Sequence, residues 1–211
     1  ECLDKENYYF PIDLSSSGSC MIGGNIATNA GGINALKYGS MKENIIGLEI
    51  VTGDGSVITS LSKMKKNNSG YDLKSILCNS EGTLGLITKV LLKIFPKPKN
   101  NFTFFVAYKD LKTCINSFNK IRELYFDKLE SAELIPNLSF KVCVKNNFLK
   151  KHFFEKEMPW YVIYRLNLYE DKLLFQDLFE KNFDLINKDI YDILIPNSID
   201  QENKIWKFRD D

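Results

Sequence analysis

The second half of the chain alternates strand-like and helix-like patterns of apolar positions. Short, nearly continuous apolar runs are typical of buried strands, and apolar residues at three- and four-residue spacing are typical of amphipathic helices. The order is strand, helix, strand, strand, helix, strand, which is that of a ferredoxin-like split unit. We therefore expect one antiparallel sheet with two helices on a single face. The expected strands are residues 102–108, 131–135, 160–168 and 190–195, and the expected helices are residues 111–125 and 173–183.

The first half of the chain has a different texture, with shorter apolar runs separated by turns. The run 45–52, the turn Gly53-Asp54-Gly55 and the run 57–60 predict a β-hairpin. A further strand is expected over residues 84–95.

The distribution of glycine divides the chain. All 12 glycines lie between Gly18 and Gly85, and glycine is favoured where the backbone takes a positive φ or approaches a ligand closely. The prolines of the segment 96–101 prevent a strand from continuing into a sheet interior. We therefore expect an α+β chain of two domains, with ligand-facing loops in residues 1–97 and a separate core in residues 98–211.

Composition and charge argue against several kinds of partner and several classes of protein. The chain has 28 basic and 27 acidic residues and a net charge of +1, which gives no electrostatic reason to expect nucleic acid or an anionic membrane as the partner. No apolar run approaches the roughly 18 to 20 residues that span a bilayer. The five cysteines form no C-x-x-C pair and indicate reduced thiols. A single histidine, His152, leaves a metal site short of ligands.

The most distinctive segment runs from Gly18 to Gly32 without a charged residue. Small side chains over such a length expose backbone N–H groups that can hold a phosphate. The paired glycines do not have the G-x-G-x-x-G spacing, which disfavours a Rossmann nucleotide fold. The alternative is a tight loop whose glycines only let neighbouring backbones pack.

A second segment, Asn79 to Thr88, leads into the last strand expected in the first half. Gly82 and Gly85 again permit close backbone approach, and Glu81 could cap a turn or bond a ribose. The alternative is a turn before a strand, with Glu81 in solvent. Two segments of small residues in one domain favour a shared ligand.

The first half of the chain carries four motifs that together resemble a known family. The motifs are residues 23–32, Lys37-Tyr38-Gly39, Gly70-Tyr71-Asp72-Leu73 and residues 80–88. In their order and spacing they resemble the vanillyl-alcohol-oxidase type of FAD-binding dehydrogenases, and within it the enzymes that act on D-2-hydroxyglutarate, D-lactate and glycolate. The resemblance covers the entire chain and is strongest from Phe10 to Pro98. It implies that residues 1–97 are the second half of an FAD-binding domain and residues 98–211 an incomplete ferredoxin-like cap domain for the substrate.

The resemblance also implies which residues hold FAD. The first motif would line the flavin diphosphate and continue toward the flavin ring. The motif of residues 80–88 would lie near the adenosine end, where the backbone of Ile87 would meet the adenine. Neutral backbone donors, rather than lysines, would then surround the diphosphate. The implied cofactor-binding residues are Ser19, Cys20, Met21, Gly23, Gly24, Asn25, Thr28, Asn29, Ala30, Gly31, Glu81, Gly82, Gly85 and Ile87.

The segment Trp206-Lys207-Phe208-Arg209 resembles the W-x-x-R that opens the family's substrate-binding helix. The family's arginine holds the substrate carboxylate, and a planar guanidinium suits a carboxylate in two bonds as a lysine does not. Asp210 stands where the family usually has a glutamate. The alternative is a solvated Arg209 beside two aspartates.

No catalytic residue is expected within this chain. The family's substrate lysine and its histidine-containing metal site lie downstream of the W-x-x-R, so a zinc-like divalent metal of the complete enzyme would have no ligands here. His152 is expected at the surface or half buried, without a catalytic role. Nearby aromatic residues are expected in the core of the second domain rather than on a stacking surface. They are Phe148, Phe153, Phe154, Trp160, Tyr161 and Tyr164.

The resemblance implies FAD-dependent oxidation of a D-2-hydroxy acid, with D-2-hydroxyglutarate ranked first, to the 2-oxo acid by hydride transfer to the flavin. Further partners would be an electron acceptor, such as an electron-transfer flavoprotein or a quinone-linked protein, and a second copy in a homodimer. The family's first FAD subdomain is absent, so the chain alone is expected to be inactive. The alternative is a non-catalytic flavin-fold subunit. The compartment would be the cytoplasm in a bacterium and the mitochondrial matrix in a eukaryote.

Overall fold

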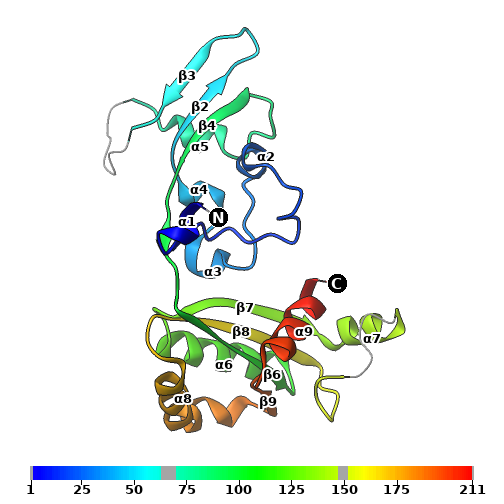
Figure 1. Ribbon diagram of the computed structural model, residues 1–211. Coiled ribbons are helices and arrows are strands. Elements are labelled where there is room, and N and C mark those ends of the chain that lie inside the picture. Colours follow the sequence, from blue (N-terminus) through cyan, green and yellow to red (C-terminus); the bar gives the residue numbers. More distant parts are fainter. Residues whose placement is uncertain (1, 63–69, 147–151, 211) are drawn as a thin grey trace. The chain divides into compact units, whose positions relative to one another are not determined.

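The computed structural model describes residues 2–62, 70–146 and 152–210, and the chain divides into two units (Figure 1). The first unit comprises Glu1–Lys97 and the second Pro98–Asp211. The division falls inside the proline-containing segment 96–101, and each unit has a sheet of its own. Among the described residues, no helix is long and apolar enough to cross a membrane.

The first unit is built on a three-stranded antiparallel sheet with the order β3-β2-β4. β2 and β3 form the hairpin predicted from the sequence, in which Val51 pairs with Val57. A second, two-stranded sheet pairs β1 with β5. The elements are α1 (Cys2–Lys5), β1 (Tyr8–Tyr9), α2 (Ile22–Ala27), α3 (Ala35–Tyr38), α4 (Met41–Asn44), β2 (Ile45–Val51), β3 (Val57–Ser60), α5 (Leu73–Leu77), β4 (Leu86–Leu92) and β5 (Phe95–Pro96).

The strand predicted over residues 84–95 is shorter at both ends. β4 starts only after Gly85, whose φ is +153° and whose added Cβ would lie 2.7 Å from the carbonyl oxygen of Val51. This close approach to β2 requires glycine and sets the turn into the strand. At the other end, β4 ends at Leu92. The N–H of Lys93 still donates to the carbonyl of Asn44, and the chain pairs again two residues later as β5.

The core of the first unit joins the loops to the sheet. Apolar side chains from α2, α4, β2 and α5 form one buried cluster, and removing such side chains from water is the main stabilising term. Its buried members are Ile26, Met41, Ile45, Leu48, Ile50, Leu77 and Cys78. The short helix α2 is therefore held in place by its one fully buried side chain, Ile26.

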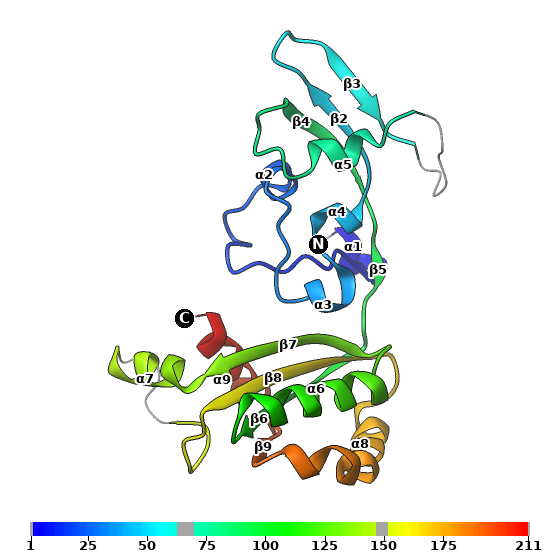
Figure 2. The ribbon, with the colours of Figure 1, turned by 180° about the vertical axis from the view of Figure 1, so that it is seen from behind.

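The second unit contains a four-stranded antiparallel sheet with the order β7-β8-β6-β9, which confirms the predicted ferredoxin-like order. Figure 2 shows α6 and α8 on one face of this sheet, as predicted. The elements are β6 (Asn100–Tyr108), α6 (Leu111–Leu124), β7 (Leu129–Pro136), α7 (Asn137–Lys145), β8 (Trp160–Leu168), α8 (Lys172–Ile186), a short 3-10 helix (Asn187–Asp189), β9 (Asp192–Leu194) and α9 (Ile199–Asp210).

The two faces of this sheet bury different side chains because neighbouring residues of a strand point to opposite faces. Phe102, Phe104 and Val106 of β6 pack with Phe175 and Phe179 of α8. On the other face, Phe105 contacts a second aromatic group that includes Phe140 of α7 and Phe208 of α9.

The prediction that the aromatic residues lie in the core is confirmed where the structure describes them. Phe154, Tyr161 and Tyr164 are buried, and Trp160 packs against the core. Phe153 is half buried and contacts the rings of Phe105 and Phe208. Phe148 lies outside the described residues. The helices α7 and α9 were not part of the predicted order; both are additions to the ferredoxin-like unit.

Candidate functional site

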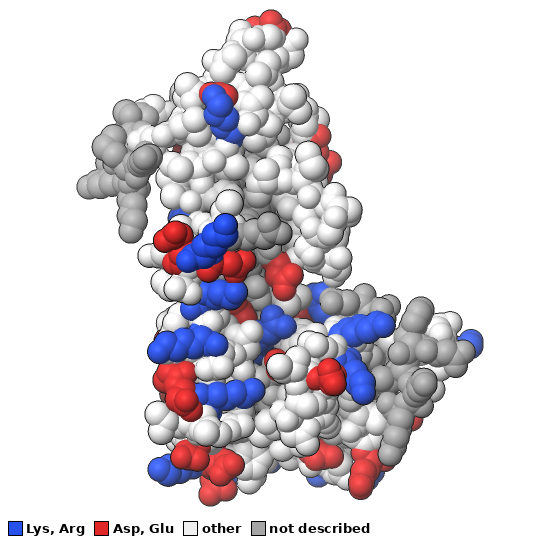
Figure 3. Space-filling view, viewed as in Figure 1, with Lys and Arg blue, Asp and Glu red and all other residues white. Residues whose placement is uncertain are grey.

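The glycine-rich segment places the start of α2 at an uncharged part of the first unit. The backbone N–H of Asn25 donates to the carbonyl of Met21 and closes the first turn. The N–H groups of the residues before it, from Ile22 to Gly24, precede the first bond of this kind, as the first donors of any helix do. Met21 at the N-cap offers no side-chain hydrogen bond to them. The surface over α2 also carries few charged side chains on the face shown in Figure 3.

The first predicted residues of this segment use their donors internally. The N–H groups of Ser19 and Cys20 both donate to the carbonyl of Ser16 at 2.9 Å. The side chain of Asn25 donates to the sulfur of Cys20 at 3.3 Å. These bonds form the turn that precedes α2. They favour the N–H groups of the α2 start as phosphate donors, including that of Ile22, which the motif comparison did not single out.

The structure brings the two predicted segments together. The N–H of Asn79 donates to the carbonyl of Ile26 at 3.1 Å, and the N–H of Glu81 donates to that of Ala27 at 2.8 Å. These bonds satisfy carbonyls at the end of α2, which have no partner within the helix. At the opposite end, a Cβ placed on Gly23 would lie 3.7 Å from the carbonyl oxygen of Ile87.

The second segment reaches α2 through backbone in the left-handed region. Asn79, Glu81 and Gly82 have φ values of 68°, 49° and 78°. Asparagine and glycine accept this conformation most readily, whereas a glutamate there is uncommon. Glu81 and Gly82 are both exposed, and a Cβ on Gly82 would meet nothing within 4 Å.

Residues 28–31 support the loop rather than project from it. The side-chain oxygen of Asn29, whose φ is 51°, accepts from the N–H of Lys42 at 2.9 Å and so holds α4. The hydroxyl of Thr28 donates to the carbonyl of Gly24 at 3.0 Å. Ala30 packs against the core, and a Cβ on Gly31 would contact the Ala35 side chain at 3.5 Å.

The residues of the first unit fit a dinucleotide cofactor such as FAD. A diphosphate needs several converging N–H donors, and the α2 start offers them without a side-chain cap. A Cβ on Gly24 would meet nothing within 4 Å, so a ligand can approach this backbone closely. The same unit also has exposed apolar side chains suited to flat rings, among them Met21, Leu84 and Leu86.

In the second unit, Arg209 belongs to a polar group on the face of the sheet that α9 covers. Its Nε donates to Oε2 of Glu133 on β7 at 3.0 Å, and both side chains are about one quarter exposed, at 24% and 27%. The expectation that the W-x-x-R opens a helix is wrong here, because Trp206 and Arg209 lie within α9, which begins at Ile199.

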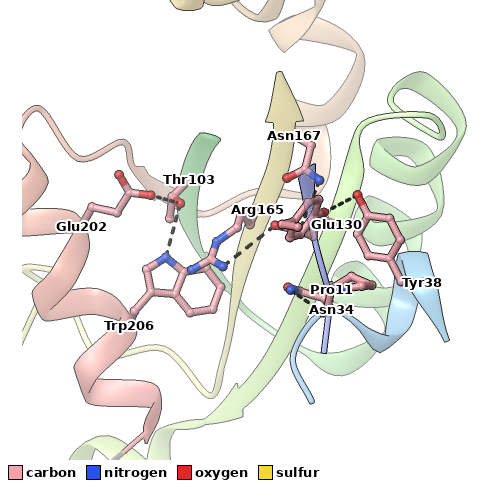
Figure 4. Close-up of polar contacts among 10 residues, drawn as sticks. Pro11, Asn34, Tyr38, Thr103, Glu130, Arg165, Asn167, Glu202 and Trp206 are labelled. Carbon is pink, nitrogen blue, oxygen red and sulfur yellow. Dashed lines mark hydrogen bonds and ion pairs between the residues drawn. The ribbon is translucent and has the colours of Figure 1, made fainter. Parts of the chain in front are cut away.

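A second arginine lies beneath the same helix, and sequence reasoning missed it. The guanidinium of Arg165 on β8 stacks on the Trp206 ring at 3.9 Å, and its Nη1 lies 3.9 Å from Oε2 of Glu130 (Figure 4). The amide of Asn167 donates to the other oxygen of Glu130 at 3.0 Å. The sequence did contain a signal for Arg165, because it is a single arginine inside the apolar run of residues 160–168.

His152 is half buried, as predicted. Its Nδ1 accepts from the N–H of Phe154 at 3.1 Å, its Nε2 lies 3.1 Å from the hydroxyl of Tyr161, and its ring stacks on Phe140. Burial raises the pKa of the Tyr161 hydroxyl. Within the described ranges, no three His, Cys, Asp or Glu side chains gather as a metal site would require.

Comparison with known proteins defines the class first. Residues 1–60 match the family model of the FAD binding domain. Among solved structures, alkyldihydroxyacetonephosphate synthase is similar with a TM-score of 0.67 at 19% identity, over 99% of this chain and 40% of that one. Residues 1–60 are therefore similar to the FAD binding domain, and the chain as a whole shares the fold of alkyldihydroxyacetonephosphate synthase.

The relatives in sequence are dehydrogenases of 2-hydroxy acids. The mitochondrial D-2-hydroxyglutarate dehydrogenase of Bos taurus is 39% identical over 161 residues, which are 76% of this chain and 29% of that protein. A mitochondrial protein of Schizosaccharomyces pombe, provisionally named a D-lactate dehydrogenase, is 32% identical over 99% of this chain and 40% of its own length. The chain thus spans about 30% to 40% of these relatives.

Proposed function

We propose that this chain is part of an FAD-dependent dehydrogenase that oxidises a D-2-hydroxy acid, with D-2-hydroxyglutarate the first candidate. The observation that carries the proposal is the pairing of the two segments around α2, which presents uncapped N–H groups beside open glycine backbone. The names of the two relatives support the substrate class. When bound, FAD would accept the hydride from the α-carbon of the substrate.

In this proposal the first unit binds the cofactor through its backbone. The N–H groups of Ile22, Gly23 and Gly24 would hold the diphosphate, and the Ile87 backbone would lie at the adenine. Of the residues implied by the resemblance, Ser19, Cys20 and Asn29 would act by shaping the loop, because their described bonds are within the protein. The remaining contacts to FAD would come from outside this chain.

The second unit would bind the substrate through Arg209. A guanidinium meets a carboxylate with two parallel N–H bonds, which fixes the orientation of the acid as well as its position. A lysine keeps the charge but not this geometry. The divalent metal of the resemblance would need ligands from outside this chain, so no step is assigned to it.

The proposed partners and compartment follow from the same resemblance. They are a 2-hydroxy acid, an electron acceptor such as an electron-transfer flavoprotein or a quinone-linked protein, and a second copy in a homodimer. Both named relatives are mitochondrial proteins, and we propose the mitochondrial matrix if the source is a eukaryote and the cytoplasm if it is a bacterium.

The test, made on the complete FAD-loaded enzyme of which this chain is proposed to be part, is reduction of bound flavin by candidate acids in the absence of oxygen. D-2-hydroxyglutarate or D-lactate should bleach the absorbance of oxidised FAD, and the L enantiomers should not. Replacing Arg209 by Lys should lower kcat/KM by about 10- to 100-fold, equivalent to roughly 1.4 to 2.8 kcal/mol, with unchanged flavin content. Arg122→Lys is the matched control, because Arg122 is an exposed arginine on α6.

Two results would count against the proposal. Full activity of Arg209→Lys on every D-2-hydroxy acid would remove Arg209 from the substrate site. Flavin that no D-2-hydroxy acid reduces would leave the non-catalytic flavin-fold subunit as the better description.

A further inference from the structure

Besides the aromatic contact of Phe208 with Phe105, α9 meets the sheet of the second unit through a stripe of polar contacts. Glu202, Trp206 and Arg209 are spaced four and three residues apart, so they share one face of the helix. Glu202 and Trp206 both bond the hydroxyl of Thr103 on β6, at 2.5 Å and 3.4 Å. Arg209 reaches Glu133 on β7. The stripe therefore crosses the sheet, and its last contact is the one that holds the arginine head group.

The two arginine–glutamate pairs under α9 differ in geometry. Arg165 and Glu130 are 3.9 Å apart, with Glu130 almost fully buried at 4% side-chain exposure, and the guanidinium plane is covered by Trp206. Arg209 and Glu133 are 3.0 Å apart through Nε, and both remain partly exposed. The first pair is enclosed within the protein, whereas the second lies partly at the surface.

We propose that Glu133 is the positioning residue of Arg209. This inference rests on the proposed function, in which Arg209 binds the substrate carboxylate. A charge-assisted bond to Nε fixes the orientation of the planar guanidinium before the ligand binds. Without this bond, the arginine side chain would lose conformational entropy when the ligand orders it. With Nε directed at Glu133, a substrate carboxylate would be met by the Nη1–Nη2 edge. Glu133 is a positioning residue in this proposal because it acts only through Arg209.

The composition of the chain makes the pair directly observable. Arg122, Arg165 and Arg209 are its three arginines, so protein labelled with ¹⁵N-arginine gives three Nε–H signals, assigned by replacing each arginine with lysine. We expect the Arg209 signal to exchange with water more slowly than that of exposed Arg122. Glu133→Ala should remove this protection, and Glu133→Gln should keep part of it, because the amide oxygen still accepts a hydrogen bond.

The functional readout is the split between KM and kcat in the complete FAD-loaded enzyme of which this chain is proposed to be part. Glu133→Ala should raise KM for the 2-hydroxy acid about tenfold while kcat changes less than about threefold, and Glu133→Gln should recover most of the loss. The control is Glu123→Ala, which removes an exposed carboxylate on α6. Flavin content should be equal in all variants.

The outcomes separate the two proposals. Inactivity of the unaltered, complete FAD-loaded enzyme with every 2-hydroxy acid overturns the proposed function and the positioning role with it. An active protein in which Glu133→Ala leaves KM unchanged overturns the positioning role alone. An Arg209 Nε–H signal that does not respond to Glu133→Ala overturns the pair itself.

Discussion

Replacing Arg165 by Met should destabilise the second unit strongly. The methionine fills similar space but leaves Glu130, with 3% exposure, without its cationic partner. Removing one member of a buried ion pair costs about 3 to 5 kcal/mol because the other charge stays buried. We expect about 3 kcal/mol, at the lower end, since the pair distance is 3.9 Å and the amide of Asn167 still bonds Glu130. The cation–π contact with Trp206 is lost in the same step.

The assay is urea unfolding followed by tryptophan fluorescence. Trp160 and Trp206 are the two tryptophans of the chain, and both lie in the second unit, so the signal reports that unit without contribution from the first. The exposed Arg122→Met on α6 serves as the control, with an expected change below about 0.5 kcal/mol.

A double substitution tests the cause. Glu130→Gln together with Arg165→Met removes both charges, so it should be more stable than Arg165→Met alone by about 1 to 2 kcal/mol. A loss below about 1 kcal/mol in Arg165→Met, or a double variant no better than the single one, would refute the argument that Glu130 is a buried charge held by Arg165.

Two further predictions concern the first unit. Gly32→Ala should lower the free energy of unfolding by more than about 3 kcal/mol, because φ is +84° and the new Cβ would lie 2.0 Å from the carbonyl oxygen of Asp13. Urea unfolding followed by far-ultraviolet circular dichroism measures this change. The control is Gly24→Ala, which should be neutral or stabilising because Gly24 lies in a helix with open space around it. The hydrogen bonds from Ser40 hold the pKa of Glu43 below its ordinary value of 4.5, so Glu43 stabilises the fold above that pH and loses this effect as the pH falls through the lowered pKa. Glu43→Gln should therefore be less stable by about 0.5 kcal/mol at neutral pH, a small value because the carboxylate is exposed, and the difference should vanish in acid; a difference independent of pH would contradict the role of the charge.

Elements defined by local pattern could be predicted from the sequence, and elements defined by distant contacts could not. The apolar runs of β6 and β8 predict buried strands directly, since their side chains are buried on both faces of the sheet. α7 is helical although its β-branched Val142 and Val144 favour a strand, because burial of Phe140 and Cys143, three residues apart, decides the conformation.

The same distinction applies to the candidate site. The segment 18–32 could be recognised because glycine and other small residues mark positions where the backbone takes an unusual conformation or approaches another group closely. The internal use of the Ser19 and Cys20 donors was not recognisable, since it depends on the turn formed with Ser16. Arg165 could be suspected as a charge within an apolar strand, but nothing in the sequence indicates that its partners are Glu130 and Trp206.

The two units therefore respond to substitution by different physical routes. Around α2 the proposed cofactor contacts are backbone N–H groups, so a side-chain change matters when it alters φ, adds a Cβ in a close approach, or breaks a bond such as that of Asn29 to Lys42. Under α9 the contacts are pairs of charged side chains, so the effect of one change depends on whether its partner is also changed. Because of this difference, single glycine substitutions are the sharper test of FAD binding, and paired substitutions of arginine and glutamate are the sharper test of the substrate site.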